Sequence, residues 1–169
     1  SLRKFLRKDD KIIVVEPNRA KTLFVSLQNG KPSLAKGKVS IMGRLDCKEP
    51  SWTAFHSLTK TTNFFMHLED DYVEKKLKFI NDVGITTSPS GGAGIIALIY
   101  AIENQLFEIN EDSSPLVLSW LGGGSHRSAH RFLHRLLSSA CRIFTSTALD
   151  LVWMPQVNAH SLRQVEALP

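Results

Sequence analysis

The chain has 169 residues, of which 43% are hydrophobic and 22% charged, and its formal net charge is +5 at pH 7. This composition is typical of a soluble folded domain, or of part of a larger one, and it excludes collagen-like, wholly disordered and disulfide-stapled proteins. Two cysteines, and no apolar run near the roughly 18 residues that a membrane-spanning helix needs, favour a reducing, cytoplasmic compartment. The chain begins with Ser1 and lacks the apolar centre of a secretory signal, so we expect it to start within a longer protein.

The basic charge is distributed unevenly along the chain. All twelve lysines lie at or before Lys78, whereas four of the six histidines lie after Trp120, among Arg and Ser residues near a GGG triplet. Residues 1–119 carry a net charge of +2 and residues 120–169 a net charge of +3. We therefore predict two parts, 1–119 and 120–169, that differ in origin or role.

The first part opens with a strand and a helix. Residues 11–17 (KIIVVEP) are a compact β-branched run that predicts a buried strand. Asn18 is placed to cap the helix that follows, and Asn29-Gly30 is placed to end it. The apolar residues at helical spacing are Ala20, Leu23, Phe24 and Leu27.

A loop, a short helix and a second strand come next. Residues 35–51 predict a loop with a short extended piece, and Ser51 then caps a helix that carries Trp52, Phe55 and Leu58. Residues 63–68 (NFFMHL) predict a second strand.

Two further helices and a strand complete the first part. Acidic residues 69–71 favour a helix start, and Gly84 is expected to end that helix. Its buried stripe is predicted to consist of Tyr72, Val73, Leu77 and Ile80. A nearly continuous apolar helix is predicted from Ser90 to Asn104, and residues 115–119 (PLVLS) are predicted to be the last strand.

This alternation predicts an α/β fold with a mostly parallel sheet flanked by helices, followed by a helical or irregular basic tail. Ligands of such folds usually bind beyond the carboxyl ends of the strands. The candidate sites are therefore two loops, at residues 41–51 (IMGRLDCKEPS) and residues 86–94 (TTSPSGGAG).

The loop at residues 86–94 combines hydroxyl groups with glycines that lead into a helix. Ser88, Ser90, Gly91 and Gly92 could present hydroxyls and backbone N–H groups to an anion or a polar ring atom. The spacing matches neither a Walker loop nor a dinucleotide fingerprint. The alternative is a serine-capped buried helix whose glycines allow close packing.

The loop at residues 41–51 contains Gly43, Cys47, Glu49 and Ser51 on a flexible, mixed-charge stretch. A nucleophilic role for Cys47 beside Lys48 can be imagined, but no histidine stands in a recognisable nucleophile motif nearby. We expect His56 and His67 to be half-buried packing residues.

It is at these loops that the sequence resembles a family. VEPNRAKTLFVSLQNGKP, GRLDCKEPSWTAF, GITTSPSGGAGIIALI and PLVLS are similar to the later half of pyridoxal-phosphate-dependent enzymes of the tryptophan-synthase-β type (fold type II). Within that superfamily they most resemble diaminopropionate ammonia-lyases and threonine-dehydratase-like enzymes. The resemblance covers about residues 8–119, and the GRLDCKEPS stretch is its most discriminating part.

The resemblance implies β-elimination of ammonia from a small amino acid such as diaminopropionate, with pyridoxal 5'-phosphate as cofactor. Ser88, Ser90, Gly91 and Gly92 would line the cofactor cavity. Ser119 would face the pyridine nitrogen. Gly43, Cys47, Glu49 and Ser51 would lie on the substrate side, and the enzymes of this type are usually homodimers.

The chain departs from that pattern in ways that bear on activity. The family's Schiff-base lysine and its phosphate-binding glycine run are both absent, and after PLVLS the chain reads WLGGGSHRSAH. We assign no catalytic residue and expect an incomplete carboxy-terminal portion of an ammonia-lyase, for which cofactor binding is doubtful.

The tail permits several readings. His126, His130 and His134 recur every fourth residue, each before an arginine, with apolar residues between them. If helical, this stretch is basic and amphipathic, which suits nucleic acid, an anionic membrane or an acidic protein. The alternative function is therefore a non-enzymatic α/β binding module that docks through its tail. A tail translated out of frame is a third possibility. We predict no metal site, since Cys141 is the only further soft ligand.

Overall fold

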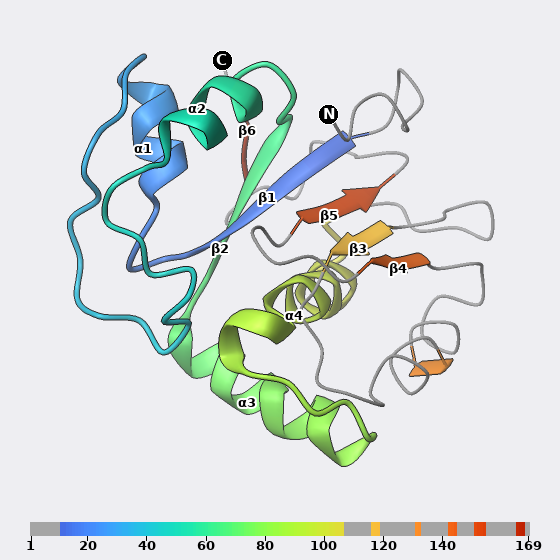
Figure 1. Cartoon of the computed structure of the whole chain (residues 1–169). Helices are drawn as coiled ribbons and strands as arrows, with labels where there is room; N and C mark the ends of the chain where they lie inside the picture. The colour runs from blue at the N-terminus through green and yellow to red at the C-terminus, as the bar shows by residue number, and fades with distance from the viewer. Residues whose placement is uncertain are drawn as a thin grey trace.

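The computed structural model describes residues 11–106, together with residues 116–118, 131–132, 142–144, 151–154 and 165–167. These residues form a mixed β-sheet with helices on both faces (Figure 1). The α/β class predicted from the sequence is therefore observed.

Two neighbouring strands of the sheet run parallel to each other. β1 (Lys11–Pro17) and β2 (Phe64–Leu68) pair in parallel, from Ile13 opposite Phe64 to Pro17 opposite Leu68. Both strands coincide with apolar runs that the sequence predicted, because a strand covered by helices on both faces needs apolar side chains on both faces.

The rest of the sheet corrects the expectation of a mostly parallel sheet. Its order is β4-β3-β5-β1-β2-β6, with β3 at Leu116–Leu118, β4 at Arg142–Phe144, β5 at Leu151–Met154 and β6 at Val165–Ala167. β3 pairs with β4 in parallel, but β5 is antiparallel to β1 and β3, and β6 is antiparallel to β2.

The tail therefore contributes three short strands that the sequence did not predict. β5 lies between β1 and β3, so residues on both sides of position 119 share one sheet. The division into two parts at that position stays a prediction. The helix predicted around His126, His130 and His134 falls almost wholly outside the described residues.

One face of the sheet is covered by two short helices, α1 (Thr22–Gln28) and α2 (Trp52–Leu58). The side chains buried beneath them are Ile12, Val14, Leu23, Phe24, Leu58 and Phe65. Ser51 caps α2 as predicted, since its side chain accepts a hydrogen bond from the Ala54 N–H. Asn18 does not cap α1, because the helix begins only at Thr22 and its cap position is Lys21. The Asn18 side-chain amide donates a hydrogen bond to Glu69.

The opposite face carries α3 (Asp70–Asp82) and α4 (Pro89–Glu103) (Figure 1). β1 contributes Ile13 and Val15 to this core, since alternate residues of a strand point to opposite faces. The apolar helix α4 is buried almost throughout, as its composition predicted. Gly84 follows α3 at φ 84°, a left-handed conformation that glycine adopts without strain. Among the described residues, no helix is long and apolar enough to cross a membrane.

Candidate functional site

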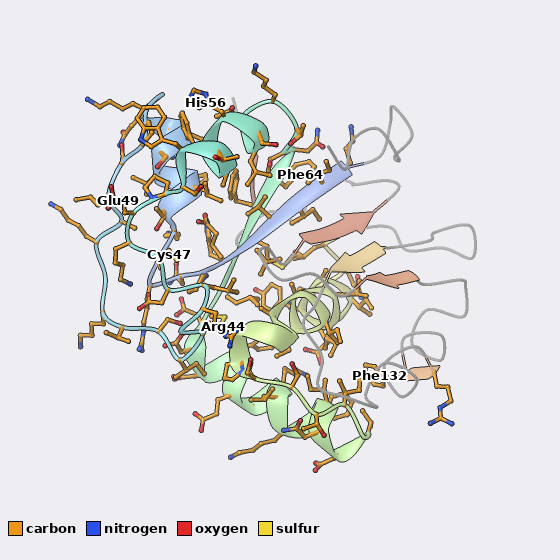
Figure 2. All side chains as sticks on the ribbon, in the orientation of Figure 1. Arg44, Cys47, Glu49, His56, Phe64 and Phe132 are labelled. Atoms are coloured by element: carbon orange, nitrogen blue, oxygen red, sulfur yellow. The ribbon has the colours of Figure 1, made fainter. Side chains whose placement is uncertain are left out.

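A cavity of about 520 Å³ lies beyond the carboxyl end of β1. Its walls come from the end of β1, the start of α1, the loop at residues 44–50 and the start of α2. The described lining residues are Val14, Val15, Glu16, Pro17, Thr22, Leu23, Arg44, Leu45, Cys47, Glu49, Pro50, Ser51 and Ala54. Figure 2 shows Arg44 and Cys47 on the loop that runs past the end of β1.

The loop is held in place by the ammonium group of Lys48. This group donates to the backbone carbonyls of Arg19 and Lys38, at 2.8 and 3.0 Å, and forms an ion pair with Asp46. The Lys48 carbonyl in turn accepts from the Ala35 N–H at 2.8 Å. One side chain therefore ties three separate stretches of loop backbone together.

Asp70, the first residue of α3, fixes the preceding part of the same loop. Its buried carboxylate accepts from Ser40 Oγ at 2.6 Å and from the Ile41 N–H at 3.2 Å, and it pairs with Arg19 at 2.9 Å. Its negative charge is thus balanced by a cation and by two hydrogen bonds, as a buried charge normally is.

The two loops predicted to carry function are connected to each other. Ser90 Oγ, in the first turn of α4, accepts from the Arg44 N–H at 3.0 Å. On the other side of the loop, Thr22 Oγ1 donates to the Cys47 carbonyl. The start of α4 thereby positions the cavity loop, although Ser90 is not among the described lining residues.

The substrate-side residues of the prediction lie mostly at the cavity. Cys47, Glu49 and Ser51 line it, whereas Gly43 is not among the described lining residues and has open space where a Cβ would be. Their proposed contact with a substrate stays a prediction.

The residues predicted to bind the cofactor have structural partners. Ser88 caps α4 by accepting from the Gly91 N–H at 3.1 Å. Gly91 and Gly92 are buried within α4, and a Cβ on Gly92 would lie 2.9 Å from the Thr87 methyl carbon. These contacts match the alternative of a capped helix with close packing. Ser119 lies outside the described residues.

The same contacts bear on whether these residues fit pyridoxal 5'-phosphate. The Ser88 and Ser90 hydroxyls already accept hydrogen bonds from the chain, and the space beside Gly92 is filled by Thr87 and Ile80. Among the described lining residues of the cavity there is no lysine. The described lining of this cavity therefore lacks the lysine that a covalent cofactor site requires.

Glu16 is a polar residue of the cavity that the sequence analysis missed. It is buried at the end of β1, and its carboxylate accepts from the N–H groups of Leu23 and Phe24 at 2.8 and 3.1 Å. Burial raises the pKa of Glu16 from 4.5 to about 7, a larger effect than the lowering by these N–H groups. An acidic residue within an apolar strand run, next to Pro17, was the signal available.

His67 lies next to Glu16 on β2, in register with it. Its Nε2 atom is 4.0 Å from Glu16 Oε2, too far for a hydrogen bond, and has no hydrogen-bond partner in the described part of the chain. Burial, and secondarily the charge of Lys21, lowers the pKa of His67 to about 3, so the imidazole is neutral near pH 7. Its ring packs against Phe24 at 5.1 Å, which supports the packing role predicted for it, although it is fully rather than half buried.

His56 differs from its prediction because it is exposed. Its ring lies 5.5 Å from that of Trp52 and 5.7 Å from that of Phe55, on the outer side of α2. Within the described ranges, no three His, Cys, Asp or Glu side chains form a group that could hold a metal ion.

Comparisons with known proteins give little further identification. No family model and no curated protein matches the sequence. A crystal structure of a threonine deaminase from T.th. matches the fold weakly, with a TM-score of 0.46 and 14% sequence identity over 52% of this chain. The chain matches 30% of the length of that threonine deaminase chain.

Proposed function

We propose that this chain supplies the substrate side of a pyridoxal-phosphate-dependent ammonia-lyase that acts on a small, diaminopropionate-like amino acid, and that it does not complete the reaction alone. The observation that carries the proposal is the cavity. The GRLDCKEPS stretch on which the sequence resemblance chiefly depends also provides a wall of this cavity, through Arg44, Cys47, Glu49 and Ser51.

The cavity has the size and polarity that a small amino acid requires. Its volume of about 520 Å³ lies within the usual range for small-molecule sites, roughly 300–1,000 Å³. Arg44 offers a cation for a carboxylate, and the hydroxyls of Thr22 and Ser51 retain hydrogen-bonding capacity beyond their contacts within the chain. Apolar atoms of Val14, Leu23 and Leu45 fill the remaining wall.

The chemical step is not assigned to this chain. The cofactor would hold the electrons left on the substrate carbon when a proton is removed. The described lining of the cavity provides no lysine to attach it. This chain's residues would bind and orient the substrate and exclude water. A cytoplasmic location and a homodimer, as in the enzymes it resembles, complete the proposal.

Ligand binding tests the proposal directly. We expect the full chain to bind L-2,3-diaminopropionate, L-serine or L-threonine in isothermal titration calorimetry. Ala54→Phe places an aromatic ring in the cavity and should abolish this binding, whereas Thr53→Phe adds the same bulk at an exposed position of α2 and should leave it unchanged. Absence of binding by the unmodified chain would rule the proposal out.

A cofactor experiment tests the second half of the proposal. We expect the purified chain mixed with pyridoxal 5'-phosphate to give no visible-edge absorbance band, and borohydride reduction to fix no adduct at a single lysine. A stoichiometric adduct at one lysine would show instead that the chain completes the cofactor site by itself.

The alternative of a binding module that docks through the tail depends on residues 126–143. Of this stretch the structure describes only residues 131–132 and the beginning of β4, so the alternative stays a prediction. Deletion of residues 120–169, the obvious test, would also remove β5, which pairs with β1. Charge-neutralising substitutions at Arg127, Arg131 and Arg135, followed by heparin retention at increasing salt, avoid that problem.

A further inference from the structure

Glu16 is a buried carboxylate at the cavity that forms no ion pair with a described lysine or arginine, and the charge of Lys21 lowers its pKa less than burial raises it. The ion pairs among the described Lys, Arg, Asp and Glu side chains are Arg19–Asp70, Lys48–Asp46 and Lys76–Glu103. The neighbour of Glu16 is His67, whose buried imidazole is neutral. A buried charge is normally paired with an opposite charge, whereas the printed hydrogen-bond partners of the Glu16 carboxylate among the described residues are backbone N–H groups.

Capping of α1 does not account for this carboxyl group. The N–H groups of Leu23 and Phe24 stabilise the charged form, yet the cost of burial outweighs them and the pKa of Glu16 is still raised. A neutral glutamine could accept one of these hydrogen bonds without that cost. An ionisable group that lines a cavity, and whose cost of burial is not offset by its hydrogen bonds, is typical of a binding site.

We infer that Glu16 receives an alkylammonium group of a ligand, distinct from the α-ammonium group of an amino acid, so that the cavity selects small molecules with such a cationic amine. This inference rests on the proposed function in that the same cavity is the ligand site. It goes further in naming the residue that recognises the amine. Arg44, at the loop wall, remains available for an anionic group of the same ligand.

The inference predicts that ligand binding releases a proton from Glu16. Near pH 7 part of the Glu16 population carries a proton, and a cation bound against the carboxylate favours the ionised form. Binding then releases that proton to the buffer, while the ammonium keeps its own, since aliphatic ammonium groups titrate well above neutral pH. The charged or titratable groups nearest Glu16 or sharing its cavity are His67 on β2, Lys21 before α1, and Arg44, Cys47 and Glu49 on the loop. Among the described lining residues, α2 and its cap contribute only the uncharged Ser51 and Ala54.

The experiment compares ligands that differ in one group. L-2,4-diaminobutyrate and L-homoserine share a carbon skeleton, but the first has a side-chain ammonium group where the second has a hydroxyl group. Propylammonium carries the amine without the amino-acid group. Each is titrated into the full chain at pH 6, 7, 8 and 9, in two buffers of different ionisation enthalpy. We expect diaminobutyrate to bind about tenfold more tightly than homoserine at pH 8, the size of a charge-assisted hydrogen bond. Release of up to about half a proton per ligand is expected at pH 7, and almost none at pH 9.

Variants identify the group that releases the proton. Glu16→Gln should remove both the preference for the amine and the proton release. Glu49→Gln tests the other acidic residue of the cavity, and Glu74→Gln, on the exposed side of α3, is the matched control that should change neither. If Glu16→Gln fails to fold, the proton release of the unmodified chain decides the question.

The outcomes separate this inference from the proposed function. Equal binding of the two amino acids without proton release overturns the inference and leaves the proposed function standing. Binding of propylammonium alone, with Glu16-dependent proton release, supports the inference and contradicts the proposed function. If Glu49→Gln loses the preference for the amine and Glu16→Gln keeps it, the amine is bound by Glu49 and the inference is overturned. If none of the three ligands binds, both the inference and the proposed function are overturned.

Discussion

Two regions of the molecule differ in whether their buried polar side chains have partners. One comprises the starts of α3 and α4, and the other is the end of β1. Asp70 and Ser90 both have partners within the chain, and these partners hold the loop at residues 41–51 in place. At the end of β1, Glu16 forms no ion pair with a described lysine or arginine, and His67 Nε2 has no hydrogen-bond partner in the described structure. The first region stabilises the fold, whereas the second costs stability and adjoins a cavity, which is the usual character of a binding site.

The largest expected effect concerns the pH dependence that Glu16 creates. Its pKa is raised from 4.5 to about 7, so its contribution to stability is fully present below pH 4.5 and is lost as the pH rises through 7. Relative to the unmodified chain, Glu16→Gln should therefore gain about 3 kcal/mol of unfolding free energy between pH 4.5 and pH 8. Urea unfolding at the two pH values measures this, and a constant difference would contradict the buried, unbalanced carboxyl group.

His67 should give the opposite pH dependence. Its pKa is lowered from 6.5 to about 3, so its contribution is present above pH 6.5 and is lost as the pH falls. Relative to the unmodified chain, His67→Gln should gain about 2–3 kcal/mol between pH 6.5 and pH 4.5. Because Glu16 acts in the other direction over this interval, the two contributions offset one another in the unmodified chain, and only the single variants reveal them in urea unfolding.

Removal of the buried charge at the start of α3, where Asp70 has partners within the chain, should lower the free energy of unfolding at every pH near neutral. Asp70→Asn weakens the pairing with Arg19 and the hydrogen bonds that hold Ser40 and Ile41, and we expect a loss of about 2 kcal/mol, since the Arg19 guanidinium is partly exposed. Asp71→Asn, in the same helical turn but exposed, should change stability by less than about 0.5 kcal/mol. Equal effects of the two substitutions in urea unfolding would contradict the contrast between the regions.

Glycine-to-alanine substitutions compare how tightly the backbone is packed at the start of α4 and in the loop at residues 41–51. Gly92→Ala would place a Cβ 2.9 Å from the Thr87 methyl carbon and 3.2 Å from Ile80 Cδ1, and we expect it to destabilise the fold by about 1–2 kcal/mol. Gly43→Ala meets no atom within 4 Å, so it should change stability by less than about 0.5 kcal/mol. Thermal unfolding of both variants measures the difference. An unchanged stability of Gly92→Ala would contradict the close packing beside Gly92 and would make the start of α4 a candidate ligand site again.

The helices and the first two strands could be predicted from the sequence because their signals are local. Ser51, the acidic start of α3 and Gly84 mark helix ends through contacts within a few residues. The strands of the tail could not be predicted, since segments of three or four residues carry no periodic pattern and their partners lie far away along the chain.

The site was predictable in part for the same reason. Cys47, Glu49 and Ser51 belong to a recognisable loop, which connects α1 to α2 and lies near the carboxyl end of β1, where α/β folds place ligands. Glu16 was missed because its burial depends on how α1 folds back over the end of β1, a tertiary contact. Asn18 was wrongly predicted as a cap because α1 begins four residues later, at Thr22, with Lys21 at the cap position.

The pairing of β1 with β5 has a consequence for how the chain matures. β1 is synthesised well before β5, the strand that covers one of its edges. Until then that edge exposes unpaired backbone groups of an apolar strand, the kind of surface on which other nascent chains assemble. Slow translation or premature termination before Leu151 should therefore favour aggregation over a soluble shorter form.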